Sequence, residues 1–240
     1  MKPIVKTILW LTAFSIAMGY LECAVVVYLR ELYYPEGFKF PLTFIPPNIA
    51  VTEFVREIAT LIMLLGIGIL TGKSNIEKFA FFIYCFAIWD IFYYVFLKVI
   101  LGWPETIFDW DILFLIPVPW VGPVLAPVIV SLTMILLAFV IVCFDQKNCP
   151  SKFLFKEKLF LISGCLILVS SFIRDYLRYV YTENSTNKLW TLSSKESLFS
   201  EVANYVPRDY NWTIFWTGEI ILLLAIGFYF LRMRRSRPYV

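Results

Sequence analysis

Ten ionisable residues lie within stretches of this sequence that are otherwise strongly apolar. An ionisable side chain in hydrocarbon costs at least about 2.5–3.5 kcal/mol, so such residues usually face a protein interior and mark a proton relay, an ion path or a substrate site. Six are acidic and four are basic: Glu22, Glu53, Glu57, Asp90, Asp175 and Glu219, and Arg56, Lys98, Arg174 and Arg178. Two carboxylates therefore exceed the available cations and need a proton, a bound cation or water. Glu22 and Glu219 are the first candidates, because neither has a basic neighbour in its own apolar stretch.

Helical spacing places several of these groups on shared faces. Residues three or four positions apart are neighbours on a helix surface. Asp90, Tyr94 and Lys98 follow one such stripe, and Tyr93 lies beside it. The spacing also permits a purely structural interpretation in which acids and bases pair and hold the helices together. The pairs that fit it are Glu53 with Arg56, Asp90 with Lys98, and Asp175 with Arg178.

Several kinds of chemistry are excluded by residue type. The chain has no histidine, which excludes histidine-ligated haem, the usual zinc and copper sites, and Ser-His catalysis. No phosphate-binding loop, nucleophile elbow or paired-histidine zinc motif is present. We therefore predict no metal site, and the sequence leaves any cofactor and any catalytic residue unknown.

The elements that carry these residues are membrane-spanning helices. Of the 240 residues, 60% are hydrophobic and only 16% are charged, against roughly 45–50% apolar residues in a soluble domain. Apolar stretches long enough to cross a bilayer, about 20 residues, recur along the chain. The sequence predicts an all-α polytopic membrane protein forming one transmembrane domain over residues 1–240. Its six spans are expected at about 5–30, 49–72, 79–101, 120–144, 159–181 and 211–231.

The segment 102–119, between the third and fourth spans, does not fit a simple span. It is apolar but rich in proline, which removes a helix hydrogen-bond donor and disfavours helix before it. We expect an interfacial or re-entrant element that caps the polar region. Asp109 and Asp111 within it need water or a cation, and Arg174 and Arg178 are the candidate partners.

The distribution of basic residues predicts the orientation. Twelve Lys and Arg residues fall on the side of both termini and five on the other, which places the termini in the cytoplasm. We expect a multi-pass protein of the plasma (inner) membrane, with residues 182–210 as an extracytoplasmic loop. The net charge of +3 is too small and too dispersed for nucleic-acid binding. The expected partners are membrane lipids and other membrane subunits.

The six acids within the spans share one depth range. At a helix rise of about 1.5 Å per residue they lie about 6–16 Å from the outer ends of their spans. We therefore expect them to converge with Arg56, Lys98, Arg174, Tyr93 and Tyr94 in one outer-half pocket that binds or moves a small solute, a cation or a proton. Two alternatives stay open: a structural or accessory subunit of a larger membrane complex, and an intramembrane enzyme acting on a lipid-like substrate.

Overall fold

Six long helices make up most of the molecule. The computed structural model describes residues 3–145, 152–183 and 204–235. All six helices are long and apolar enough to cross a membrane, which confirms the prediction of a polytopic, six-span membrane protein. They are α1 (Pro3–Tyr33), α2 (Pro47–Thr71), α3 (Asn75–Leu101), α4 (Leu125–Asp145), α5 (Phe155–Glu183) and α7 (Trp212–Arg235).

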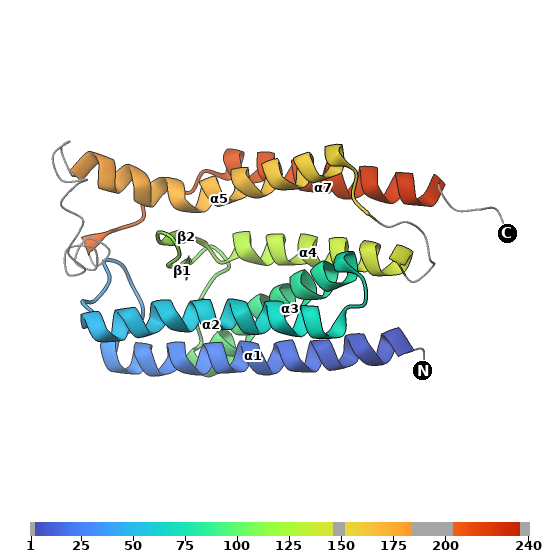
Figure 1. The fold of residues 1–240 in the computed structure, drawn as a ribbon. Helices are drawn as coiled ribbons and strands as arrows, with labels where there is room; N and C mark the ends of the chain where they lie inside the picture. Colours follow the sequence, from blue (N-terminus) through green and yellow to red (C-terminus); the bar gives the residue numbers. More distant parts are fainter. Residues whose placement is uncertain (1–2, 146–151, 184–203, 236–240) are drawn as a thin grey trace.

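The helices form a layered bundle with α4 in its centre (Figure 1). On one side α5 packs against α7, and on the other α1 and α2 both pack against α3. The central α4 contacts α3 and α7, and so joins the two sides. Because the number of spans is even, α1 begins and α7 ends at the same end of the bundle (Figure 1). We call the opposite end, where α1 finishes and α2 begins, the outer end.

A short β-hairpin interrupts the helical pattern between α3 and α4. Strands β1 (Trp110–Phe114) and β2 (Trp120–Pro123) pair antiparallel, with a register shift between Ile112 and Phe114. The fourth helix consequently begins at Leu125, five residues after the predicted start at 120, because residues 120–123 bond to β1 instead of continuing a helix. β2 packs against α5, and the ring of Phe114 stacks 6.0 Å from that of Phe86, near the middle of α3.

A glycine within α2 permits close contact between α2 and α3. A Cβ atom added at Gly68 would lie 2.9 Å from the backbone oxygen of Lys78 and 2.9 Å from the backbone nitrogen of Phe82. Backbone atoms cannot move aside as the end of a flexible side chain can. The two helices therefore approach at a distance that excludes even a methyl group at this position.

We expect Gly68→Ala to lower the free energy of unfolding by about 1–3 kcal/mol, the usual cost of overpacking. Gly66→Ala is the matched control, since nothing lies within 4 Å of its added Cβ and alanine favours helix over glycine. Thermal unfolding of both variants in detergent measures the difference. Equal unfolding temperatures for the two would contradict the close α2–α3 contact.

Candidate functional site

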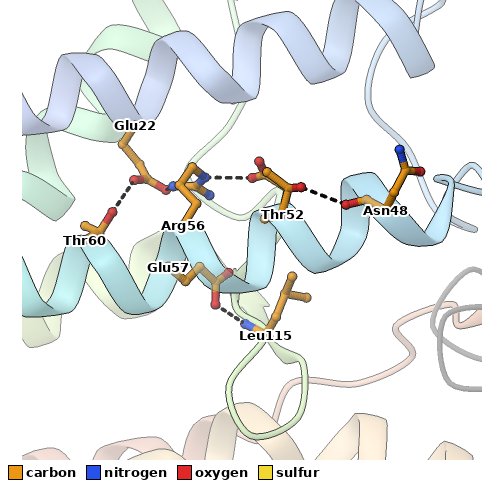
Figure 2. Close-up of polar contacts among 8 residues, drawn as sticks. Glu22, Asn48, Thr52, Arg56, Glu57, Thr60 and Leu115 are labelled. Atoms are coloured by element: carbon orange, nitrogen blue, oxygen red, sulfur yellow. Dashed lines mark hydrogen bonds and ion pairs between the residues drawn. The ribbon is translucent and has the colours of Figure 1, made fainter. Parts of the chain in front are cut away.

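An ion-pair network joins α1 and α2 in the outer half of the bundle. Arg56 donates through Nη1 to Glu22 on α1 and through Nε to Glu53 Oε2, the latter at 2.8 Å. The Thr60 hydroxyl lies 3.4 Å from the second oxygen of Glu22, and Figure 2 shows the group between the two helices. The expectation that Glu22 lacks a cation is therefore wrong: its partner comes from the neighbouring helix, at a similar depth.

The hairpin loop approaches α2 from a different side. The backbone N–H of Leu115 donates to Glu57 Oε2 at 3.0 Å, and in Figure 2 Leu115 and Glu22 lie on different sides of α2. Glu57 lies ten residues into α2, about 15 Å along its axis. The contact therefore places the tip of the hairpin well inside the length of the helices.

A second ion pair connects β1 with the outer end of α1. Arg30 Nη2 lies 3.6 Å from Asp111 Oδ1, and both side chains are almost completely buried. The Arg30 guanidinium also lies 4.4 Å from the ring centre of Phe38 and 3.8 Å from that of Trp103. The predicted partners of Asp111, Arg174 and Arg178, are exposed on α5 instead. Sequence alone could not place α1 beside the hairpin, so the Arg30 pairing was missed.

Burial is the dominant influence on the Asp111 carboxyl, which lies on β1 outside the six spans. Burial raises its pKa from an ordinary 3.8 to about 6, against the opposing effects of Arg30, the Ile112 backbone and the Tyr94 hydroxyl. The native carboxyl thus holds its proton more tightly than the unfolded one. The free energy of unfolding is therefore expected to fall by about 3 kcal/mol as the pH rises from below about 4 to above about 6.

Asp111→Asn should remove this part of the pH dependence. We expect the variant to lose roughly 3 kcal/mol of the variation in unfolding free energy between about pH 3.5 and 7. Asp209→Asn, at an exposed position of the outer end, is the control and should leave the pH profile unchanged. Thermal unfolding across this range gives the profiles, and a profile of Asp111→Asn that coincides with the wild type would contradict the assignment.

Two further acids bond to hydroxyl groups of the central helix α4. The Ser131 hydroxyl donates to Asp90 Oδ2 on α3 at 2.8 Å, and the Thr133 hydroxyl donates to Glu219 Oε1 on α7. Glu219 is 1% exposed, and its Oε2 atom has no hydrogen-bond partner in the described part of the chain. No described Lys or Arg side chain bonds to either acid. Glu57 and Asp175, which accept from Leu115, Tyr205 and the Arg208 backbone, also bond to no described Lys or Arg side chain. Asp90 and Glu219 differ from them in that a hydroxyl group of α4 is their described partner.

The structure does not bring the other predicted residues into one bonded network. Lys98 is exposed and donates to the backbone oxygens of Gly102 and Pro104, so its predicted pairing with Asp90 is wrong. Asp175 accepts from the Tyr205 hydroxyl at 2.6 Å and from the Arg208 backbone. The predicted cap residue Asp109 instead closes a local turn, accepting from the backbone of Glu105 and from Thr106.

The two predicted tyrosines lie near Asp111 and near acids of α1 and α3. Tyr94 is buried within electrostatic range of both Asp111 and Asp90, and its hydroxyl faces Asp111. Tyr93 lies within range of Glu22 and Asp111, and its ring is 4.9 Å from that of Tyr94. Tyr94 therefore lies near both Asp111, toward the outer end, and Asp90, near the middle of α3.

Sequence reasoning missed the hydroxyl groups that bond to Asp90 and Glu219. Ser131 and Thr133 are buried in α4, in a helix otherwise made almost entirely of apolar residues. Small hydroxyl residues are common in spans, where they also bond to their own backbone. Their isolation within α4 is the one signal that could have identified them.

Comparison with known proteins finds no match: no protein family, no curated protein and no solved structure is significantly similar to this chain. What the arrangement can do chemically therefore follows from its own groups. The residues of this region offer carboxylates, hydroxyls and the ion-paired Arg30 and Arg56. These groups can bind and exchange protons or bind cations.

Proposed function

We propose that this integral membrane protein binds a proton or a small monovalent cation at Asp90 and Glu219 and moves it through the membrane. The observation that carries the proposal is Glu219, a buried carboxyl group with one hydroxyl partner and one oxygen that has no described partner. Asp90 also bonds to a hydroxyl group of α4, that of Ser131.

A proton or a bound cation would neutralise the negative charge of the two acids and so stabilise them inside the bundle. A buried charge without a counter-charge costs several kcal/mol. Glu219 is 1% exposed and Asp90 is half-buried. A proton or a bound cation removes this cost. Among the described residues no three acidic or cysteine side chains gather as a metal ion would require. A proton, or a monovalent ion held by few ligands, therefore fits the two acids better than a divalent ion does.

The hydroxyl groups of Ser131 and Thr133 can hydrogen-bond to Asp90 and Glu219 whether these acids are ionised or protonated. A hydroxyl donates to a carboxylate but accepts from a carboxylic acid, so Ser131 and Thr133 satisfy either state by rotation. The two lie two residues apart on α4 and serve opposite neighbours, α3 and α7. The central helix thus links both acids, and Tyr94, which lies within electrostatic range of both Asp111 and Asp90, is the proposed polar group between Asp90 and the outer end.

A flux experiment tests this function. Purified protein is placed in liposomes that contain a pH-sensitive dye, and a potassium diffusion potential is applied in sodium and in sodium-free buffers. We expect a protein-dependent flux that falls at least about tenfold in Asp90→Asn and in Glu219→Gln, which remove the exchangeable charge. Glu105→Gln, at an exposed outer position, is the matched control and should keep the flux.

A structural subunit is the second candidate, because one observation favours it. Arg56 is bonded to two acids on two helices, as expected of a group that holds a bundle together. A flux equal to that of protein-free liposomes, or one unaffected by both substitutions, would support the subunit and contradict the proposal.

The proposal also includes the membrane and the orientation of the protein in it. We place the protein in the plasma (inner) membrane with both termini in the cytoplasm, on the basis of the twelve-to-five distribution of basic residues. The hairpin would then enter from the outer face as a re-entrant element, and residues 182–210, most of which lie outside the described residues, would form an extracytoplasmic loop. Lipids and other membrane subunits are the proposed partners. An impermeant thiol reagent should then label Glu105→Cys, and not Lys156→Cys, in intact cells.

A further inference from the structure

A cavity of about 340 Å³ opens at the outer end, between the α1–α2 loop and the segment that joins α3 to β1. It is open on one side and not enclosed, and its volume is near the lower end of the range for small-molecule sites. Aromatic side chains make up most of its lining: Phe38, Phe40, Trp103, Phe108 and Trp110. None of the acids proposed to carry the ion contributes to it, so a ligand here would be bound independently of the proposed function.

Three of these aromatic rings contact one another and so hold one another in place. The ring of Phe38 lies 5.6 Å from that of Phe40 and 5.8 Å from that of Trp103, both in edge-to-face geometry. Edge-to-face contacts favour a defined arrangement of rings. The lining is therefore built before any ligand arrives, and the cost of ordering it on binding is small.

The same rings already attract a cation. The Arg30 guanidinium lies over the rings of both Phe38 and Trp103, as the negative faces of aromatic rings favour. Asp111 pairs with Arg30, so this charge is compensated within the fold. Arg30 occupies these two ring faces, so a ligand in the cavity would use the other lining rings, Phe40, Phe108 and Trp110, over which no described cation lies.

The charged residues of the lining also favour a cation. Glu105 and Asp109 are acidic, and Lys39 is the one base among the residues that line the cavity. The Lys39 ammonium lies 3.7 Å from Glu36, on a side chain that is 72% exposed. With Lys39 offset by Glu36, the lining has a negative balance next to its aromatic rings.

We propose that this cavity binds an organic ammonium group of the trimethylammonium type, held by cation–π contacts and by the negative charge of Glu105 and Asp109. Aromatic residues combined with carboxylates are the side chains that recognise such weakly hydrated cations. The same headgroup chemistry is available from a free quaternary amine such as choline and from a phosphatidylcholine lipid at the membrane surface.

Choline binding tests the proposal. Radiolabelled choline is titrated into the full-length protein in nanodiscs of phosphatidylglycerol, with the uncharged isostere of choline, in which carbon replaces nitrogen, as competitor. We expect saturable binding that the isostere does not displace. Phe108→Ala and Glu105→Gln, both at exposed positions, should each weaken binding roughly three- to tenfold. Phe44→Ala and Asp209→Asn are the matched controls, since Phe44 is 57% and Phe108 60% exposed.

A second arm distinguishes the two sources of the ligand. If the lipid headgroup occupies the cavity, nanodiscs that contain phosphatidylcholine should suppress choline binding in the wild type, whereas a site for a free amine should keep it. Both outcomes support the proposal. Absence of saturable choline binding in phosphatidylglycerol nanodiscs would overturn it, as would equal competition by the isostere, or unchanged binding in both Phe108→Ala and Glu105→Gln.

Discussion

Replacing Arg56 by glutamine should lower the free energy of unfolding by about 3 kcal/mol, the lower end of the range for breaking a buried ion pair. The substitution leaves Glu22 and Glu53 close together without a cation, with side chains only 13% and 14% exposed. Like charges in a partly buried setting repel and are poorly hydrated. The loss should therefore exceed that of a simple hydrogen bond.

The matched control is Arg174→Gln, which removes an exposed arginine from α5 and should change the free energy by less than about 0.5 kcal/mol. Replacing Glu22 and Glu53 by glutamine in the Arg56→Gln background should restore most of the loss, because no uncompensated charge remains. Chemical or thermal unfolding in one detergent gives all three values. An Arg56→Gln variant as stable as Arg174→Gln would contradict the ion-pair network.

The second prediction compares two buried acids, one that is paired with a cation and one that is not. Glu157 is 5% exposed and accepts from Arg232 Nε at 2.7 Å and from the Leu154 backbone at 2.9 Å. Glu157→Gln strands the Arg232 charge and should destabilise the protein by about 3 kcal/mol. Glu219→Gln makes the same substitution at an acid that is also buried. This acid bonds to the Thr133 hydroxyl and to no described Lys or Arg side chain. The substitution should change the free energy of unfolding by less than about 1 kcal/mol.

Unfolding of the two glutamine variants under identical conditions provides the comparison. A Glu219→Gln variant destabilised as strongly as Glu157→Gln would mean that Glu219 is held as a paired carboxylate. Its proposed role as an ion-binding group would then fail.

The sequence predicted the spans well because each consists of one long apolar stretch. Its main error in the spans is the start of α4, where the apolar residues 120–123 read as helix although they form β2. Apolar residues favour burial in either structure, and the pairing with β1 depends on contacts between separate segments. Periodicity within one segment cannot reveal such contacts.

The candidate site was predictable only within each helix. The Glu53–Arg56 pair follows from spacing alone, and the structure contains it. The partners of Glu22, Asp90 and Asp111 come from other elements, and a single sequence does not say which helices are neighbours. Depth allowed the contact between Glu22 and Arg56, which lie at similar depths on neighbouring helices. It could not say that Lys98 and Arg174 would lie at exposed positions.

The account predicts that Asp90 and Glu219, each bonded to a hydroxyl of α4 and to no described cation, carry a proton or an exchangeable ion. Chemical labelling tests this most directly. A hydrophobic carbodiimide reacts with protonated carboxyl groups in apolar surroundings, and peptide mass spectrometry identifies the modified residue. Asp90 and Glu219 should be labelled in the native protein, more slowly when a competing cation is bound. Glu22 and Glu53, which share Arg56, should stay unlabelled as an internal control. The contrary result would be labelling of neither Asp90 nor Glu219 until the protein is unfolded, or equal labelling of all four acids.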